Sequence, residues 1–242
     1  MFGLLNILLV GLLAGVIAYL LGSISFSILF TKLFAHRQDI RSMGSGNAGT
    51  TNVQPIRKFA KSPTKAVVVP LRKNTFLAVF IGRLLFTWMT TFTTIEGVGA
   101  GELVQYGAYI AGFCCAIGHI FPIFFGFKGG KGVLTSWAII ALIDWRAFVL
   151  VIIVFIIVFL CSKIVSLASI CAGSSFPIFT LILNTYDYIH QSSAAGSTTL
   201  FYVIFSVAIA ALQASILVYK HRANIQRLRA GEEKKITVKK KG

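Results

Sequence analysis

A glycine-rich loop with two lysines joins two apolar runs near the middle of the chain and could bind a phosphate. It reads Phe127-Lys128-Gly129-Gly130-Lys131-Gly132-Val133 and follows Gly118-His119-Ile120-Phe121-Pro122. Glycines leave backbone N–H groups able to point at an anion, and a nearby lysine supplies a compact charge. A plain turn whose lysines only set membrane topology fits equally well. A Walker A nucleotide loop does not, because Val133 stands where that motif needs a hydroxyl for magnesium.

Three further polar clusters could take part in the same chemistry. The segment Gly44 to Val53 is crowded with glycine, hydroxyl and amide groups, which suits either a flexible linker or a set of donors to one polar ligand. Ser166 and Ser169 open a later apolar run. His221 and Asn224, spaced i and i+3, share one face of a helix, which could also be a basic helix held by anionic headgroups.

The segments that must position these clusters are those of a membrane protein. The chain has 242 residues, of which 56% are hydrophobic and 12% charged, and its mean hydropathy is +0.82. The net charge is +16, and the basic residues lie between the apolar runs, where the positive-inside rule accounts for them. Anionic lipid is therefore a more suitable partner than nucleic acid. The four cysteines lie in apolar segments without C-x-x-C spacing, so we expect no metal site.

Apolar runs predict an all-α integral membrane protein with about seven transmembrane helices. The runs cover residues 2–30, 76–95, 103–125, 134–143, 148–160, 165–184 and 199–219. The first lacks a basic n-region and a cleavage site, so it is predicted to be a retained span. The fourth is short, and the joint at Asp144-Trp145-Arg146 leaves a five-span alternative open. The domain organisation predicted is one polytopic membrane domain, 1–242, with a basic cytoplasmic loop at 34–75 and a basic cytoplasmic tail at 220–242.

The distribution of charge predicts the orientation of these spans. With the N-terminus outside and the C-terminus cytoplasmic, all but two of the 23 lysines and arginines fall on the cytoplasmic face. The exceptions are Arg146, on the opposite face, and Arg83, within the second run, where snorkelling to the interface is the simplest account. This orientation places all four polar clusters on one side of the membrane.

Taken together and in order, the clusters resemble the bacterial acyl-phosphate-dependent glycerol-3-phosphate acyltransferases. The matching stretches are Gly44 to Val53, Gly118 to Pro122 with Phe127 to Val133, Val165 to Ser169, and His221 to Ile225, with Gly22-Ser23-Ile24 ahead of them. Each is only suggestive alone, but their combination spans nearly the whole chain and is specific.

The resemblance implies an enzyme that moves a fatty acyl group from acyl phosphate to the 1-hydroxyl of glycerol 3-phosphate. The products would be lysophosphatidic acid and phosphate, made for phospholipid synthesis at the cytoplasmic face of the cell membrane. Its partners would be these two substrates and membrane lipid, without a cofactor, a metal, nucleic acid or an obligate protein partner. Carried over by residue, the catalytic positions are Ser45, Lys131, Ser169, His221 and Asn224, and the substrate-binding positions are Gly44, Gly46, Asn47, Thr51, Asn52, Arg57, His119, Lys128, Gly129, Gly130 and Gly132.

The source of the general base is open between two hypotheses. The chain has no His-x-x-x-x-Asp pair of the kind that acyl-CoA acyltransferases use. The substrate's own phosphate could therefore take the hydroxyl proton, with positioning supplying much of the rate. His221 is the rival base.

Three departures from the family's pattern bear on substrate binding. Ser25 replaces a proline, an Asp-x-x-Lys-Gly pattern is missing from the second span, and Pro55 occupies the usual arginine position. Arg57 stands two residues beyond Pro55 and is the first candidate to replace that arginine, followed by Lys58 and Arg83. The alternative functions are a membrane carrier or channel for a phosphorylated organic anion, although no internal repeat is evident, and a lipid-binding membrane protein.

Overall fold

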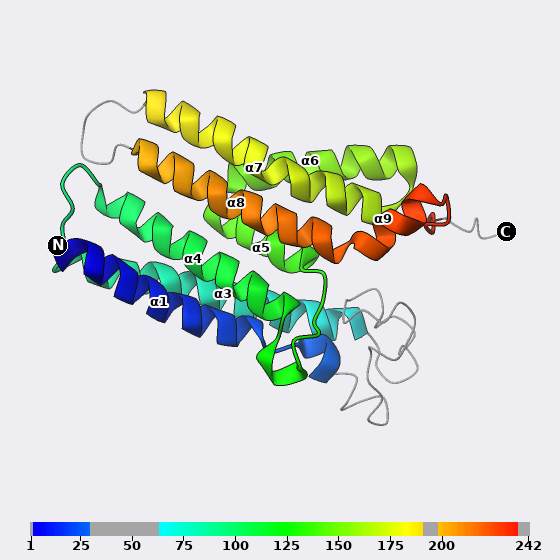
Figure 1. Ribbon diagram of the computed structural model, residues 1–242, viewed down its shortest axis with the longest axis horizontal. Helices are drawn as coiled ribbons and strands as arrows, with labels where there is room; N and C mark the ends of the chain where they lie inside the picture. Colours follow the sequence, from blue (N-terminus) through cyan, green and yellow to red (C-terminus); the bar gives the residue numbers. More distant parts are fainter. Residues whose placement is uncertain (1, 30–62, 191–197, 237–242) are drawn as a thin grey trace. The chain divides into compact units, whose positions relative to one another are not determined.

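The residues that the structure describes fold almost entirely into α-helices. A computed structural model describes residues 2–29, 63–190 and 198–236. The helices are α1 (Phe2–Gly22), α3 (Pro63–Thr90), α4 (Ala100–Ile120), α5 (Val133–Ile143), α6 (Trp145–Ser162), α7 (Val165–His190), α8 (Leu200–Lys220) and α9 (Arg222–Arg229), with a short 3-10 helix η3 (Ile123–Phe125) after α4 (Figure 1). They form two compact units: unit 1 contains α1, α3, α4 and α5, and unit 2 contains α6 to α9.

Within the described ranges, five helices are long and apolar enough to cross a membrane. They are α1 with the short helix after it, α4 with η3, α6, α7 and α8. Large apolar side chains stand exposed on these helices, for example Ile157 and Leu160 on α6, as expected for surfaces that face lipid. The all-helical membrane fold is therefore confirmed. Of the other two predicted spans, α5 is short and α3 carries four basic residues.

The second predicted run is displaced along the chain. Helix α3 begins at Pro63, inside the stretch that was expected to be a loop, and ends at Thr90 rather than near Ile95. Proline is well suited to the first helical position, because the N–H that it lacks would have no partner there. After α3 the chain turns through Gly97, which has a positive φ of 75°, and Ile95 and Val98 form an isolated β-bridge.

Unit 1 is built on a close crossing of α1 and α4. A Cβ atom on Gly22 would overlap the carbonyl oxygen of Cys115, and one on Gly118 would overlap the carbonyl oxygen of Tyr19. Small residues let helix backbones approach closely in a membrane, where packing rather than water exclusion drives association. The Gly22-Ser23 stretch therefore serves packing, as its small residues suggested.

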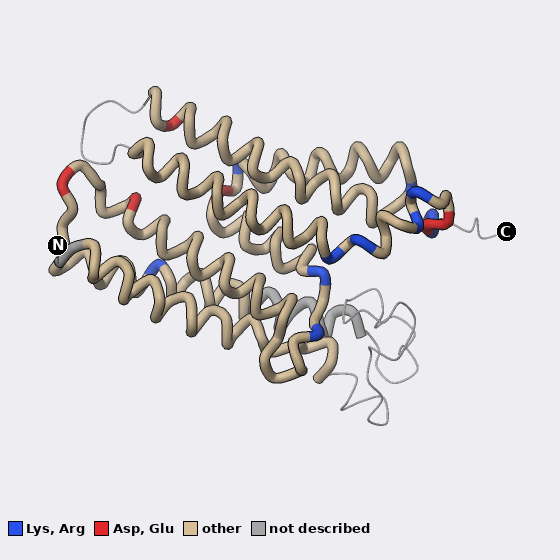
Figure 2. The backbone as a smooth tube through the Cα atoms, viewed as in Figure 1, with Lys and Arg blue, Asp and Glu red and all other residues tan. Residues whose placement is uncertain are grey.

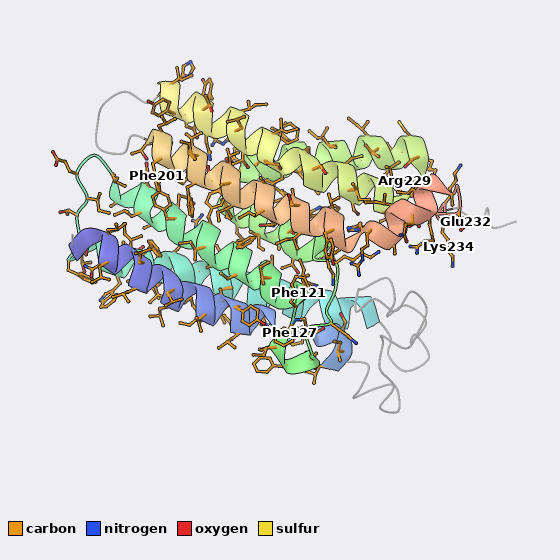
Figure 3. All side chains as sticks on the ribbon, viewed as in Figure 1. Phe121, Phe127, Phe201, Arg229, Glu232 and Lys234 are labelled. Carbon is orange, nitrogen blue, oxygen red and sulfur yellow. The ribbon has the colours of Figure 1, made fainter. Side chains whose placement is uncertain are left out.

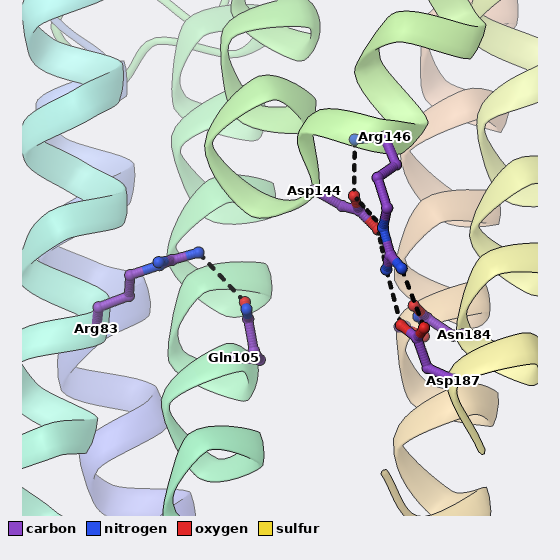
Figure 4. Close-up of polar contacts among 7 residues, drawn as sticks. Arg83, Gln105, Asp144, Arg146, Asn184 and Asp187 are labelled. Carbon is purple, nitrogen blue, oxygen red and sulfur yellow. Dashed lines mark hydrogen bonds and ion pairs between the residues drawn. The ribbon is translucent and has the colours of Figure 1, made fainter. Parts of the chain in front are cut away.

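Arg83 is hydrogen-bonded to neighbouring helices within unit 1, and its snorkelling to the membrane interface stays a prediction. Its Nη2 atom donates to the Gln105 side chain at 3.3 Å and to the Leu142 carbonyl at 2.9 Å. Figure 4 shows the guanidinium reaching from α3 toward Gln105 on α4. The Leu142 carbonyl belongs to the last turn of α5, where a cation is favoured by the helix dipole.

In unit 2, three charged side chains join α6 to α7 at one end of the helices. Arg146 pairs with Asp144 at 3.0 Å and with Asp187 at 2.7 Å, which ties the start of α6 to the last turns of α7 (Figure 4). Asp144 also caps α6 by accepting the Arg146 backbone N–H. The predicted break between two helices at this residue is therefore confirmed. Nearby, the buried Asn184 donates to Ser206 at 2.7 Å and joins α7 to α8.

In each unit, lysines and arginines gather mainly at one end of the helices, although Arg83 and Arg146 lie away from that end and Glu232 and Glu233 lie at the basic end of unit 2. In unit 1, Glu102 lies in the first turn of α4, and Lys128 and Lys131 follow its last turn. In unit 2, the basic residues of α8, α9 and the tail lie at the end where α9 is, as Figure 2 shows, and the ion pairs of Arg146 lie toward the other end.

Candidate functional site

In unit 1, the glycine-lysine loop folds back onto the end of α4. Gly126 and Phe127 both adopt positive φ, at 65° and 58°, and this pair of left-handed residues reverses the chain after η3. The Gly129 N–H then donates to the Ile120 carbonyl at 3.2 Å and the Gly130 N–H to the His119 carbonyl at 3.3 Å. Figure 3 labels the first and last residues of this return, Phe121 and Phe127.

The anion-binding role of Gly129 and Gly130 stays a prediction, because within the protein their N–H groups already have acceptors. They satisfy carbonyls in the last turn of α4, which would otherwise have no partner within the helix. Gly129 is required for close approach, because a Cβ atom there would overlap the carbonyl oxygen of His119. His119 itself is buried, and it supplies this carbonyl from the last turn of α4.

The N-terminus of α5, which follows this loop, is suited to bind an anion. The Gly132 carbonyl accepts the first helical hydrogen bond, from the Ser136 N–H at 2.8 Å, so Gly132 is the residue immediately before α5. The N–H groups of the following turn have no helical acceptor and carry the positive end of the helix dipole. Lys131 lies two residues before Val133, the first residue of α5, and is partly buried, while Lys128 is exposed.

Tyr19 fixes the start of the loop and was not predicted. Its hydroxyl donates to the Phe121 carbonyl at 2.9 Å, so the last turn of α1 holds the residue at which α4 ends. The Ser23 hydroxyl and backbone N–H in turn donate to the Tyr19 carbonyl, at 2.8 and 2.9 Å. The sequence gives no sign of the hydrogen bond from Tyr19, because this residue lies inside an apolar run and its partner Phe121 is 102 residues away.

We expect Tyr19→Phe to loosen the loop without unfolding the protein. The change removes one hydrogen bond, worth about 1 kcal/mol, which corresponds to about fivefold more frequent opening of the loop. Limited trypsin digestion followed by mass spectrometry should show about fivefold faster cleavage after Lys128. Tyr188→Phe, at an exposed position on α7, is the matched control, and equal cleavage rates in the two variants would contradict the prediction.

In unit 2, His221 stands at the junction of α8 and α9 with a defined tautomer. The residue is only 2% exposed, and its Nδ1 atom lies 2.8 Å from the Leu217 carbonyl oxygen. A carbonyl can only accept, so Nδ1 carries the proton. The Nε2 atom is consequently the ring position at which a neutral His221 can accept a proton.

Asn224, one turn further along, is oriented by Glu233. Its Nδ2 atom donates to Glu233 Oε1 at 2.6 Å, and the same oxygen accepts from Ser166 Oγ at 2.7 Å. Arg227 Nε pairs with the other carboxylate oxygen at 2.7 Å. We call these four residues the Glu233 cluster, and it joins the start of α7, helix α9 and the tail. The hydrogen bond fixes which end of the Asn224 amide is the donor.

The Glu233 cluster holds its carboxylate in the charged form. Burial by itself raises the pKa of Glu233, but the hydrogen bonds from Ser166, Asn224 and Arg227, with the charge of Arg227, outweigh it and hold that pKa below its usual range. The Ile236 N–H donates to the Lys163 carbonyl at 2.9 Å and keeps the tail against the start of α7. Figure 3 labels Glu232 and Lys234 on either side of Glu233, next to α9.

Ser169 lies one turn after Ser166 and is 3% exposed, so the two serines share a face of α7. The sequence assigned the catalytic role to Ser169, and it gave no sign that Ser166 bonds a glutamate 67 residues away. Glu233 was not predicted to take part in the site. A sequence signal for its role is lacking, because its partners come from separate segments.

The predicted site residues thus fall into two groups. Unit 1 brings together His119, Lys128, Gly129, Gly130, Lys131 and Gly132, and unit 2 brings together Ser169, His221 and Asn224. The remaining predicted positions, Gly44, Ser45, Gly46, Asn47, Thr51, Asn52 and Arg57, lie outside the described residues. Within the described ranges, no three His, Cys, Asp or Glu side chains form a group that could hold a metal ion.

Apolar helices with polar residues gathered at their ends define a polytopic membrane protein. The family model for glycerol-3-phosphate acyltransferase matches residues 12–231, and the chain belongs to this family. A glycerol-3-phosphate acyltransferase of Syntrophomonas wolfei is 36% identical over 90% of this chain and 92% of its own length. Another, from Finegoldia magna, is 34% identical over 88% of this chain and 90% of its own.

Two crystal structures show the same architecture. They are of PlsY, an integral membrane glycerol 3-phosphate acyltransferase, in its glycerol 3-phosphate form and its lysophosphatidic acid form. The first has a TM-score of 0.65 and 29% sequence identity, covering 94% of this chain and 96% of that one. The second has a TM-score of 0.61 and 28% identity. All these relatives are acyltransferases, so the carrier alternative gains no support from them.

Proposed function

We propose that the protein transfers a fatty acyl group from acyl phosphate to the 1-hydroxyl of glycerol 3-phosphate in phospholipid biosynthesis. The observation that carries the proposal is the position of Lys131 two residues before the first turn of α5, whose N–H groups have no acceptor within the helix, in a chain of this family. Both substrates carry phosphate, and a lysine next to a helix N-terminus binds that group through charge and hydrogen bonds. The PlsY structures with glycerol 3-phosphate and lysophosphatidic acid support the acceptor and the product.

The proposed reaction is one acyl transfer. The hydroxyl oxygen attacks the acyl carbonyl carbon, the bond from that carbon to the phosphate oxygen breaks, and inorganic phosphate leaves. Lys131 and the first N–H groups of α5 offset the negative charge that the phosphate gains. Acyl phosphate is already activated, so positioning by Ser45, Ser169 and Asn224 supplies much of the rate.

The hydroxyl proton has two candidate acceptors in this scheme. The first is the phosphate of glycerol 3-phosphate itself, which fits the lack of a His-x-x-x-x-Asp pair. The second is Nε2 of His221, whose ring is oriented by the bond from Nδ1 to the Leu217 carbonyl. Near-normal turnover of a His221→Ala enzyme would exclude the histidine as the base.

We further propose the membrane arrangement that the charges favour. It has seven spans, including α3 and α5, an outside N-terminus and a cytoplasmic C-terminus, and it places the active site on the cytoplasmic face. The loop 34–75 and the tail 220–242 then lie in the cytoplasm, and the whole chain forms one polytopic domain. Arg57 takes the place of the family arginine that Pro55 displaces. The segregation of Lys128 and Lys131 from Glu102 along α4 supports this orientation.

Purified protein in detergent tests the function directly. Wild type, given glycerol 3-phosphate and palmitoyl phosphate, is expected to release lysophosphatidic acid and phosphate, and palmitoyl-CoA should give neither. Lys131→Ala should lower turnover at least about 100-fold, because it removes a charge-assisted contact to the leaving phosphate. Lys235→Ala, at an exposed lysine of the tail, is the control and should leave turnover unchanged. Well-folded wild-type protein that makes no product would refute the proposal.

A further inference from the structure

The outer side of α9 carries basic residues that have no part in the chemistry described so far. Arg222, Gln226 and Arg229 stand at positions i, i+4 and i+7, so they share one face of the helix, and all three are exposed. Asn224 lies on the other side, where it is 5% exposed and donates to Glu233. This short helix therefore carries a residue of the proposed site on its buried side and two arginines on its exposed side.

The tail adds a third cation to this surface. Lys234 is exposed and directly follows Glu233, whose hydrogen bonds hold the tail beside α9. The Ile236 N–H donates to the Lys163 carbonyl at 2.9 Å, so the backbone is held on both sides of Lys234. Figure 3 labels Arg229 and Lys234 at the same end of unit 2. We call Arg222, Arg229 and Lys234 the α9 basic face.

The charges of the α9 basic face are not neutralised by carboxylates. Within the described part of unit 2, the ion pairs are those of Arg146 and Arg227, so none forms at this face. The exposed Glu232 lies nearby in the tail, but one carboxylate balances only one of the cations. Figure 2 shows lysines and arginines gathered at this end of unit 2. The α9 basic face therefore attracts anions.

The α9 basic face adjoins the end of α8, a helix long and apolar enough to cross a membrane. Tyr219 is 59% exposed in the last turn of α8, and the Arg222 guanidinium lies over its ring at 4.7 Å from the centroid. Tyrosine is enriched where a spanning helix meets the lipid headgroups, and basic residues just beyond that point are attracted to anionic lipid. Further along α8, Leu212 and Ile204 are exposed, as expected for side chains that face lipid. This continuity places the α9 basic face at the level of the headgroups.

We propose that the α9 basic face binds the headgroups of anionic phospholipids, and that this contact raises turnover by stabilising the position of α9. Each lysine or arginine near an anionic membrane surface contributes about fivefold to the affinity. Helix α9 begins directly after His221 and holds Asn224 on its buried side, so a headgroup bound to its outer side restrains both residues. The effect on turnover rests on the proposed function, whereas the binding of lipid does not.

Native mass spectrometry of the purified protein, titrated with phosphatidylglycerol or with phosphatidylcholine, tests the binding. The double variant Arg222→Gln with Arg229→Gln should raise the apparent Kd for phosphatidylglycerol at least about tenfold, because it removes two charges. Its Kd for phosphatidylcholine, which has no net charge, should stay within about twofold of wild type. The matched control is Arg222→Lys with Arg229→Lys, which keeps both charges and should bind phosphatidylglycerol as wild type does. An unchanged Kd in the glutamine pair, or an equal loss in the lysine pair, would overturn the assignment.

Nanodiscs of phosphatidylcholine alone, and of phosphatidylcholine and phosphatidylglycerol in equal parts, test the effect on turnover. With both substrates saturating, kcat of the wild type should be at least about fivefold higher in the anionic nanodiscs. The glutamine pair should have one kcat in both, equal to that of the wild type in the neutral nanodiscs. Equal wild-type kcat in the two lipids would refute the coupling. Protein that binds phosphatidylglycerol but makes no product in either nanodisc would refute the proposed function, and the lipid-binding surface would stand.

Discussion

Gly129→Ala is expected to lower turnover at least about 100-fold. The new methyl group would overlap the His119 carbonyl oxygen and lie 2.7 Å from Pro122 Cδ, both fixed parts of the end of α4. Relief requires the loop to move away from α4, which breaks the bond from the Gly129 N–H to Ile120. Lys131 and the start of α5 then shift, and a displacement of about 1 Å in a positioning group can cost about 100-fold in rate.

Gly101→Ala is the matched control for this change. Gly101 lies in the first turn of α4, and a Cβ atom there would have no neighbour within 4 Å. Alanine also favours helix over glycine by about 1 kcal/mol, so this variant should be as active as wild type and no less stable. Initial rates of phosphate release and the midpoint of thermal unfolding are measured for both variants. Near-wild-type turnover by Gly129→Ala would show that the loop does not depend on its contact with α4.

Glu233→Gln is expected to destabilise unit 2 and to lower turnover about tenfold. The new amide cannot form the ion pair with Arg227. It also has one oxygen in place of two and no negative charge, so its hydrogen bonds from Ser166 and Asn224 are weaker or lost. Hydrogen bonds to charged groups are worth about 1.5–3 kcal/mol, and because the Arg227 side chain is 43% exposed we expect a total loss of about 2 kcal/mol. Asn224 also loses the carboxylate that orients its amide, which accounts for the loss of rate.

The neighbouring glutamate supplies the control, and pH supplies a second measurement. Glu232→Gln changes an exposed carboxylate and should leave thermal unfolding and turnover unchanged. Because the folded protein lowers the pKa of Glu233, its contribution is complete above the ordinary glutamate pKa of about 4.3 and is lost as pH falls through the lower folded pKa. Wild-type stability should therefore fall in acid more steeply than that of Glu233→Gln. Equal acid dependence would argue against the cluster.

Local patterns predicted the helices well, because each depends on residues close together in the chain. Uninterrupted apolar runs predicted the five apolar helices. Asp144 predicted the break before α6, where it caps the helix. The start of α3 was missed because basic residues and Pro63 resemble a loop, although proline is also suited to the first turn. The partner of Arg83 gave no sequence signal, because its acceptor, the Leu142 carbonyl, is a backbone atom 59 residues away.

The sequence by itself determined the class of protein, the family and the residue types of the site. Hydropathy sets where helices can lie in a membrane, and the polar motifs keep their chemistry whatever surrounds them. Only the tertiary structure decided which partners these groups have: the N–H groups of Gly129 and Gly130 bond to the end of α4, Tyr19 bonds to Phe121 from 102 residues away, and Glu233 bonds to Asn224. These contacts join segments that meet only when the helices pack. No local pattern encodes them, since a side chain's role depends on the partner that folding brings to it.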